Sequence, residues 1–415
     1  MDSAIRVLSA IAGAALFAAT VHAIFINMLV PRPRSTVIGT LANAPSRMIF
    51  RWLAFRRGTF AARDSVLAVS GPVSVLAQLA VFAALFVLAS ALMVYGLSSS
   101  GFPAALYQAG SSLLTLGIVE PASTGAVTVG LVTAFVGLVL IAVLVGYLLA
   151  LYAAYSQRES AVAELGLLAG EPAWGPEFLC RASLLPHTQR IPIYTSWISW
   201  MSDVRLNHDL YPVLNMFRSV QPRRHWLVSL LAILDAAALE LTTLQRTDDR
   251  SALMRVMAEG VETLSSLNAA YLPSTARHAA NTIAADNSNT QLPLSSATRG
   301  ESVVIDAISA DARASLIGPN AGGAIEPNSD PGITREEWQY ACGLMSMAGL
   351  AVRPDMDAAW AAFSALRCRY AHNAYAIADR VYATPAPWTG VRHPTTEEVW
   401  PNLVCDRLDR GGEHA

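Results

Sequence analysis

The 415-residue sequence contains no lysine, and charged residues make up only 14% of it. Soluble globular domains carry about 25% charged residues, so this composition argues against a purely soluble protein. The 29 basic residues, all arginines, nearly balance the 31 acidic residues. With this balance the chain has no excess of positive charge that could bind DNA or RNA, so we expect no nucleic-acid partner. The exclusive use of arginine, with abundant alanine, is typical of a GC-rich bacterial genome.

Residues that carry catalysis or bind metals are also scarce. Only four cysteines occur, at positions 180, 342, 368 and 405, and none forms a CxxC pair, which argues against a disulfide framework and a zinc site. No phosphate-binding loop, HExxH motif, Ser-His-Asp signature or strand-associated GxGxxG motif is present. We therefore expect neither an enzyme nor a bound cofactor.

Hydrophobic residues are abundant, at 53% of the chain with a mean hydropathy of +0.39. They concentrate in three uncharged runs, at about 7–30, 73–95 and 126–152. Each run exceeds the roughly 20 residues that a helix needs to cross a bilayer, so we predict three transmembrane helices. The first run has an alternative interpretation as a cleaved signal peptide, because Val21-His22-Ala23 carries small residues where a signal peptidase cuts. Its apolar stretch exceeds the usual signal-peptide core, which favours the transmembrane helix.

The loop between the first two runs is strongly basic. Its only acidic residue is Asp64, and its arginines are Arg32, Arg34, Arg47, Arg51, Arg56, Arg57 and Arg63. Because basic loops stay on the cytoplasmic side, the amino terminus should lie outside. The connector after the second run should then be external, where its single charge is Glu120. These features predict a multi-pass protein of the bacterial plasma membrane, embedded in the lipid bilayer, with a cytoplasmic carboxy-terminal domain.

Residues 102–114 of this connector are helical in character. Pro103 suits the first turn of a helix, and the following residues are moderately apolar, with Gln108, Ser111 and Ser112 among them. This segment is too short and too polar to span comfortably, so it predicts a re-entrant helix that enters the membrane and returns. The alternatives are an ordinary transmembrane helix, which would be the third of four, and a surface loop.

The order of outer helix, short helix, loop and inner helix over residues 73–155 resembles the pore unit of potassium channels. That family's filter reads T-V-G-Y-G-D, and the matching positions here are Thr115, Leu116, Gly117, Ile118, Val119 and Glu120. The resemblance implies a homotetramer whose backbone carbonyls replace the hydration shell of a monovalent cation, potassium first. It also implies that the Thr115 hydroxyl lies at the inner end of the filter and Glu120 at the external mouth.

The sequence departs from that family at two filter positions. Ile118 replaces the aromatic residue that braces the filter, and Val119 replaces the second glycine, which tolerates a positive φ. These changes imply a less selective cation pore. In the last run, Gly137 occupies the place where inner helices of the family bend on gating. Close helix packing at Gly130, Gly137 and Gly146 is the alternative role of the small residues.

From residue 156 onward the composition is that of a soluble helical domain. Apolar residues recur at helical spacing in two stripes: Leu253, Val256, Met257, Val261, Leu264 and Leu267, and then Trp360, Phe363, Leu366 and Tyr370. The pattern from Thr334 to Glu337 is a capping box that predicts a helix beginning at Arg335. The apolar segment 226–245 contains Asp235, so we interpret it as a buried helix rather than as a fourth span. Its acid should pair with an arginine or cap a neighbouring helix.

Together these patterns predict an all-α membrane protein, with three transmembrane helices, a re-entrant pore helix and loop, and a cytoplasmic all-helical domain. The expected divisions are 1–71 (first span and basic loop), 72–155 (pore unit), 156–272 and 335–415 (helical domain), and 273–334, a flexible insertion. The predicted function is a passive cation channel. The alternative is a non-conducting, membrane-anchored signalling or scaffold protein that acts through its helical domain.

Overall fold

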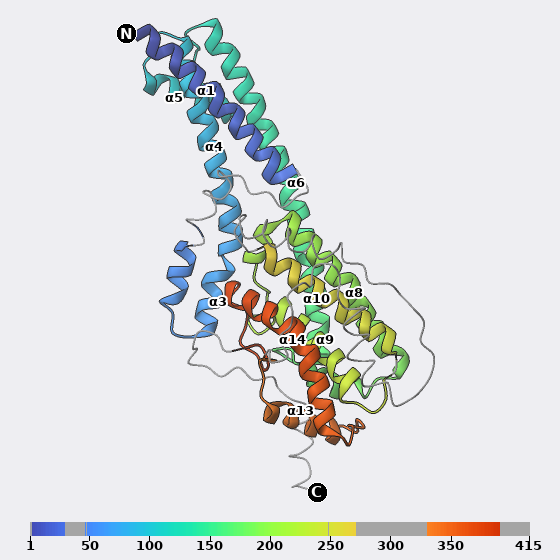
Figure 1. Cartoon of the computed structure of the whole chain (residues 1–415). Coiled ribbons are helices and arrows are strands. Elements are labelled where there is room, and N and C mark those ends of the chain that lie inside the picture. Colours follow the sequence, from blue (N-terminus) through green and yellow to red (C-terminus); the bar gives the residue numbers. More distant parts are fainter. Residues whose placement is uncertain (1, 30–45, 47, 248, 271–329, 391–415) are drawn as a thin grey trace, which may run out of the picture. The chain divides into compact units, whose positions relative to one another are not determined.

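A computed structural model describes residues 2–29, 46, 48–247, 249–270 and 330–390 (Figure 1). These residues contain eleven labelled α-helices, a further short helical stretch at 48–55 and no β-strand, apart from an isolated bridge between Leu244 and Val352. The prediction of an all-helical protein is therefore confirmed for the described part of the chain. Unit 1 comprises Met1–Ser156 and Asp209–Arg218, and unit 2 comprises Gln157–His208 and Ser219–Ala415.

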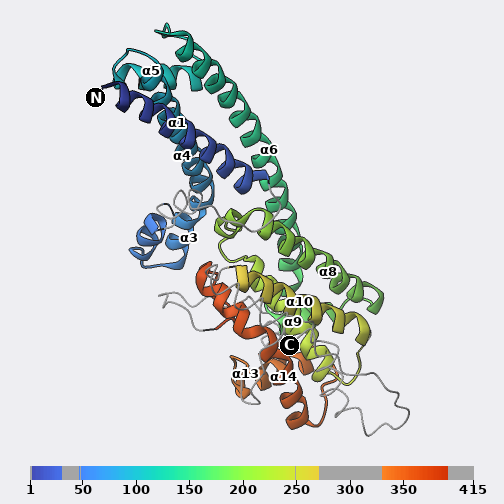
Figure 2. The ribbon, with the colours of Figure 1, turned by 45° about the horizontal axis from the view of Figure 1, so that its top comes forward.

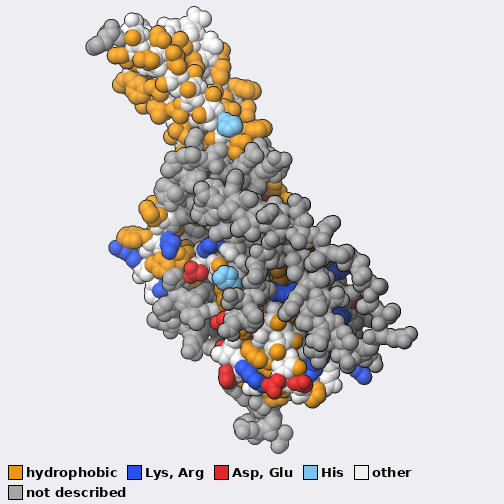
Figure 3. Space-filling view, in the orientation of Figure 1, with side chains coloured by type: hydrophobic (Ala, Val, Ile, Leu, Met, Phe, Trp, Pro, Cys, Tyr) orange, Lys and Arg blue, Asp and Glu red, His pale blue; other side chains and the backbone are white. Residues whose placement is uncertain are grey.

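Three helices of unit 1 are long and apolar enough to cross a membrane. They are α1 (Asp2–Ile24, continued by a π-helical turn at Phe25–Leu29), α4 (Ser70–Leu97, preceded by α3 at Phe60–Ala68) and α6 (Thr124–Ala169). Figure 3 shows that hydrophobic side chains cover most of the surface where these helices gather. These candidate spans indicate a multi-pass membrane protein, as the sequence predicts.

The helix α6 is longer than its apolar run. The run ends near residue 152, whereas α6 continues to Ala169. Residues 157–169, QRESAVAELGLLA, are mostly good helix formers, and the first residue after the helix is Gly170, whose φ is +79°. Hydrophobicity therefore locates the span, while a glycine with a positive φ marks the end of the helix.

The helices α1 and α4 pack antiparallel. Phe17 contacts Phe86 with ring centroids 5.1 Å apart, and nearer the start of α1, Arg6 reaches the end of α4. The Arg6 guanidinium donates to the carbonyls of Tyr95 (2.9 Å) and Ser98, and it lies 4.8 Å from the centre of the Tyr95 ring. A cation at the negative end of a helix dipole stabilises that end. Figures 1 and 2 both show α1 beside α4, with α5 near the end of α4.

Residues 209–218 belong to unit 1, although their sequence resembles that of the helical domain. Arg218 forms a buried ion pair with Asp64 of α3, with an Nε to Oδ1 distance of 2.7 Å. The Tyr155 hydroxyl donates to the Arg218 carbonyl at 3.0 Å, and Phe217 packs against Gly71 of α4. A short 3-10 helix, Pro212–Met216, lies in this segment. The ion pair and its neighbours attach the segment to the beginning of α4.

Unit 2 is built around a helix that is buried along its whole length. This helix is α9 (Trp226–Thr242), and the other helices of the unit are α7 (Gly175–Ala182), α8 (His187–Leu210, to residue 208), α10 (Arg250–Ala270), α13 (Arg335–Met347) and α14 (Met356–Arg380). Every residue of α9 is buried within the protein, which confirms the interpretation of this segment as a buried helix. Both predicted apolar stripes contribute to the same core.

The predicted start of α13 is also confirmed. Thr334 accepts from the Glu337 backbone N–H at 3.2 Å, and the Glu337 carboxylate accepts from the Thr334 N–H at 2.8 Å. The predicted flexible insertion at 273–334 lies outside the described residues except for 330–334. The last part of the predicted helical domain, 391–415, lies outside them too.

Candidate functional site

The candidate site is the segment 115–120, between two helices of unit 1. The preceding helix, α5 (Phe102–Leu113), has 12 residues, which corresponds to about 18 Å at 1.5 Å per residue. This length is well short of the roughly 30 Å hydrocarbon thickness of a bilayer. The following helix, α6, begins at Thr124. The short helix and its loop therefore stand between two helices that are each long enough to span.

The backbone of this segment is unusual at two alternate residues. Thr115 has φ +56° and Gly117 has φ +64°, both in the left-handed region, whereas Leu116 between them does not lie there. Glycine adopts this region readily, but a β-branched residue such as threonine rarely does. The sign of φ therefore changes twice between Thr115 and Gly117, so the peptide groups of this segment do not continue the direction of α5.

Hydrogen bonds to the end of α5 hold this conformation. The N–H of Thr115 donates to the Ser112 carbonyl at 3.0 Å, and the N–H of Leu116 donates to the Ser111 carbonyl at 2.8 Å. The Ile118 N–H donates to the Ser111 hydroxyl oxygen at 3.1 Å. Ser111 thus anchors two amides of the loop. Sequence reasoning noted Ser111 only as a polar residue of the short helix, because its partners depend on the turn that follows.

The segment is exposed on the single chain. Leu116 and Ile118 are 57% and 58% exposed, and Thr115, Gly117 and Glu120 are exposed as well, while Val119 is half-buried. Nothing lies within 4 Å of the position that a Gly117 Cβ would take. The structure therefore brings the six residues together in one loop whose outer side is not covered by unit 1.

Two buried polar contacts fix α5 and α4 against α6. The Gln108 side chain of α5 donates to the Ala126 carbonyl at 3.1 Å, and the Thr133 hydroxyl of α6 donates to the Ser90 hydroxyl of α4 at 2.8 Å. Hydrogen bonds of this kind hold helices together in lipid, where water cannot compete for the polar groups. They set the position of the loop at the end of α5.

Gly137, the predicted gating bend, lies within the uninterrupted helix α6. A Cβ at this position would lie 2.2 Å from the Leu113 carbonyl oxygen, far inside contact distance. The missing side chain therefore lets the last turn of α5 approach α6. This contact supports the packing role of Gly137, and bending at this position stays a prediction.

Replacing Gly137 with alanine should separate α5 from α6. Overpacking of this kind costs about 1 to 3 kcal/mol, and it would move the loop that Ser111 holds. We expect a lower thermal unfolding midpoint of the detergent-solubilised protein. The matched control is Gly146→Ala in the same helix, where nothing lies within 4 Å of the new Cβ. Equal midpoints for the two variants would contradict the packing role.

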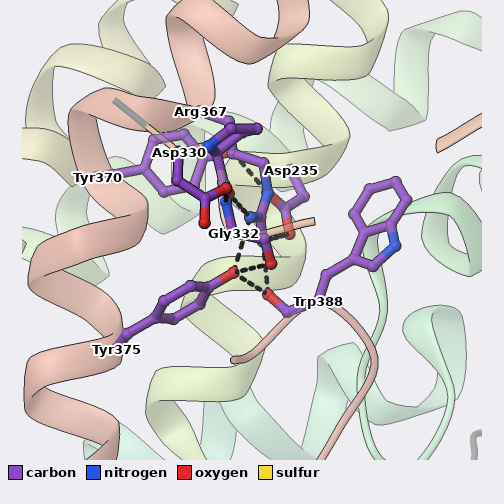
Figure 4. A network of polar contacts seen from close by, with 8 residues as sticks. Asp235, Asp330, Gly332, Arg367, Tyr370, Tyr375 and Trp388 are labelled. Carbon is purple, nitrogen blue, oxygen red and sulfur yellow. Dashed lines mark hydrogen bonds and ion pairs between the residues drawn. The ribbon is translucent and has the colours of Figure 1, made fainter. Parts of the chain in front are cut away.

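A second group of buried ionisable residues lies in unit 2 (Figure 4). The Arg367 side chain of α14 is fully buried and donates to both carboxylate oxygens of Asp235 in α9, at 2.9 and 3.3 Å. The Tyr370 hydroxyl donates to the same carboxylate at 2.5 Å. Arg367 also donates to the Tyr375 hydroxyl at 2.8 Å and to the Trp388 carbonyl at 2.5 Å. The predicted pairing of Asp235 with an arginine is confirmed.

Charge and burial oppose each other in this network. Burial raises the pKa of Asp235, while the Arg367 guanidinium and the Tyr370 hydroxyl act to lower it. Burial also raises the pKa of Tyr370 well above its usual value, so its hydroxyl keeps the proton that it donates. The network joins α9 to α14 and to the chain near Pro331 and Trp388, and its polar groups pair with one another. We therefore assign it to stability rather than to chemistry.

His208 is another buried group of unit 2. Its Nδ1 lies 2.7 Å from the Val204 carbonyl, and its Nε2 lies 3.5 Å from the Arg158 guanidinium. Burial, and secondly the positive charge of Arg158, lower the pKa of His208 from 6.5 to about 3. The imidazole is therefore neutral in the folded protein at physiological pH.

His208→Gln should make unit 2 less sensitive to acid. The pKa of His208 is lower in the folded state than in the unfolded state, so the unfolded chain takes up the proton first. Its stability contribution is complete above pH 6.5 and falls as the pH drops toward about 3, by up to about 1.4 kcal/mol per pH unit. Thermal unfolding followed by tryptophan fluorescence from neutral to acidic pH measures this slope. The exposed His372→Gln is the control, and equal slopes for the two variants would exclude the mechanism.

No protein-family model, curated protein or solved structure matches this chain. No cluster of three or more His, Cys, Asp or Glu side chains suitable for a metal ion occurs among the described residues. The loop 115–120 is thus the strongest candidate site by its geometry and its place between two spans.

Proposed function

We propose that this protein is a passive cation channel of the potassium-channel type, built from four copies of the chain. The observation that carries the proposal is the loop 115–120, which follows a 12-residue helix between two long apolar helices and has a positive φ at Thr115 and Gly117. Irregular backbone at membrane depth is tolerated only where it is buried in protein or lines a water-filled path. Carbonyl oxygens aligned by such a backbone can replace the water around a cation.

The exposure of the loop supports assembly from several copies. One re-entrant loop cannot surround an ion, and the apolar side chains of Leu116 and Ile118 lack cover on the single chain. In a homotetramer, four copies of the loop would face a common axis. The Thr115 hydroxyl would then lie at the inner end of the path and the Glu120 carboxylate at the external mouth.

The filter residues support weak selectivity among monovalent cations, with potassium as the first expectation. Val119 occupies the position of a glycine in the related filters, and its φ is not positive here. Ile118 carries no aromatic ring or hydroxyl that could brace the loop from behind. A filter with fewer rigid carbonyl positions distinguishes cations of different size less sharply.

The helical unit would lie in the cytoplasm and assist assembly or gating. Its place follows from the basic loop before α4, since the carboxy-terminal end of α6 faces the same side as that loop. Passive conduction through such a path requires no cofactor.

Reconstitution of the purified full-length protein tests the proposal. We expect potassium flux in proteoliposomes, slightly slower sodium flux, and a detergent-corrected mass of four 44.2 kDa chains. A monomer or dimer in solution, with no flux under any voltage, would overturn the channel and favour the non-conducting scaffold. In that protein the helical domain, unit 2, would carry the interaction with a partner.

A further inference from the structure

A second exposed surface of unit 1 lies before α3. Residues 48–55 form a short helix, and five large apolar side chains of this helix are exposed: Met48, Ile49, Trp52, Leu53 and Phe55. Met48 is 73% exposed and Trp52 54% exposed. Soluble surfaces rarely gather so many large apolar side chains over so few residues, so this helix presents a surface suited to an apolar environment.

Arginines surround the apolar side chains. Arg51, Arg56 and Arg57 are exposed, and the guanidinium of Arg56 lies 3.8 Å from the centre of the Trp52 ring. The guanidinium groups of Arg51 and Arg63 lie 5.8 and 5.9 Å from the Phe55 ring. Figure 3 shows basic and hydrophobic side chains side by side on this part of unit 1. The surface is therefore both positively charged and apolar.

The nearby acid does not neutralise this charge. Asp64 is buried and forms its ion pair with Arg218. Asp64 is the only acidic residue within the described residues 48–70, where the exposed arginines give a positive charge that complements an anionic partner.

A buried contact fixes the position of this helix along the length of α4. The Ser46 hydroxyl lies 2.9 Å from the Ser74 hydroxyl. Ser74 is the second residue of the apolar run that begins at position 73, so the chain enters the 48–55 helix at the inner edge of the span. In a bilayer spanned by α4, the exposed side chains would meet the boundary between lipid headgroups and acyl chains at this level.

We propose that the 48–55 helix lies in the cytoplasmic leaflet and binds anionic phospholipid. Its apolar side chains would enter the acyl boundary, while Arg51, Arg56 and Arg57 would pair with headgroup phosphates. Amphipathic helices with tryptophan on one face and arginine beside it bind anionic bilayers in this way. The proposal rests on the cytoplasmic placement of this loop and is independent of whether the protein conducts ions.

Quenching of Trp52 by brominated lipid tests this proposal. Trp52 is the only tryptophan in the sequence of unit 1, so the difference between wild type and Trp52→Phe reports this site alone. The full-length protein is reconstituted in mixed vesicles of phosphatidylcholine and phosphatidylglycerol, in which either one or the other lipid is brominated. If lipids surrounded Trp52 at random, each brominated lipid would quench its fluorescence in proportion to its mole fraction. We expect brominated phosphatidylglycerol to quench the Trp52 signal about two-fold or more beyond that proportion.

Charge removal provides the second measurement. The triple variant R51Q/R56Q/R57Q should lose the preference for phosphatidylglycerol, whereas R246Q/R250Q/R255Q, which removes three exposed arginines of unit 2, should keep it. Equal quenching by the two brominated lipids would overturn the binding of anionic lipid. Absence of any Trp52-dependent quenching would place the helix away from the bilayer and overturn the proposal completely. Potassium flux, measured on the same vesicles, separates these outcomes from a failure of the channel proposal.

Discussion

Replacing Gly117 with valine is expected to reduce potassium flux in proteoliposomes to less than about a tenth of the wild-type rate. Gly117 has φ +64°, where a β-branched residue costs about 1 to 3 kcal/mol in each copy. A tenfold change in the population of the conducting backbone corresponds to about 1.4 kcal/mol. The strain energy summed over four copies exceeds that value. The chain would relieve the strain by turning the peptide groups at 116–118 away from the path.

Gly110→Ala is the matched control for this variant. Gly110 lies within α5, nothing occupies the space within 4 Å of its new Cβ, and its φ is not positive. Alanine also favours the helix by about 1 kcal/mol relative to glycine. We therefore expect normal flux, tetramer mass and unfolding temperature. If Gly117→Val conducted as well as Gly110→Ala, the conduction path would lie elsewhere, and the segment 115–120 would serve only as a connection.

The local parts of this fold can be predicted from the sequence because their causes are local. A long uncharged apolar run has few alternatives to a membrane span, and the capping box from Thr334 to Glu337 satisfies the first amides of α13 within four residues. The helical stripes of unit 2 are likewise read from spacing alone. The start of α5 is likewise local, because Pro103 suits the first turn of a helix.

Long-range pairings could be predicted only in part. The charge of Asp235 requires a partner, which the sequence predicts to be an arginine or the end of a neighbouring helix. The choice of Arg367, 132 positions away, depends on the packing of α9 against α14. Asp64 and Arg218 are separated by 154 positions, and no pattern in the sequence connects them. This ion pair draws 209–218 to unit 1, a placement that composition could not indicate.

The backbone conformation of the candidate loop could also be predicted only in part. Glycine at position 117 signals a left-handed backbone, but threonine at position 115 gives no such signal, because β-branched residues disfavour that region. The strain at Thr115 is offset by the hydrogen bonds of the neighbouring amides to Ser111 and Ser112. Residues in strained backbone conformations often cluster at functional sites, which adds weight to the loop as the centre of function.

Replacing Arg367 with methionine is expected to destabilise unit 2 by about 3 to 5 kcal/mol. The variant leaves the Asp235 carboxylate buried without its charged partner, and it also removes the donors to Tyr375 and Trp388. Methionine fills much of the same space, so the loss would report the unpaired charge more than a cavity. Tryptophan fluorescence during chemical unfolding of the solubilised protein measures the change, because every tryptophan except Trp52 lies in the sequence of unit 2.

Two further variants separate the ion pair from a general loss of charge. Arg335→Met removes an exposed partner of Asp357, whose side chain is 82% exposed, and such surface pairs contribute only about 0 to 1 kcal/mol. Asp235→Leu combined with Arg367→Met removes both charges, so it should regain part of the stability lost by Arg367→Met alone. A double variant that is as unstable as the sum of its two single variants would show that Asp235 and Arg367 stabilise α9 and α14 independently, through packing rather than through their charges.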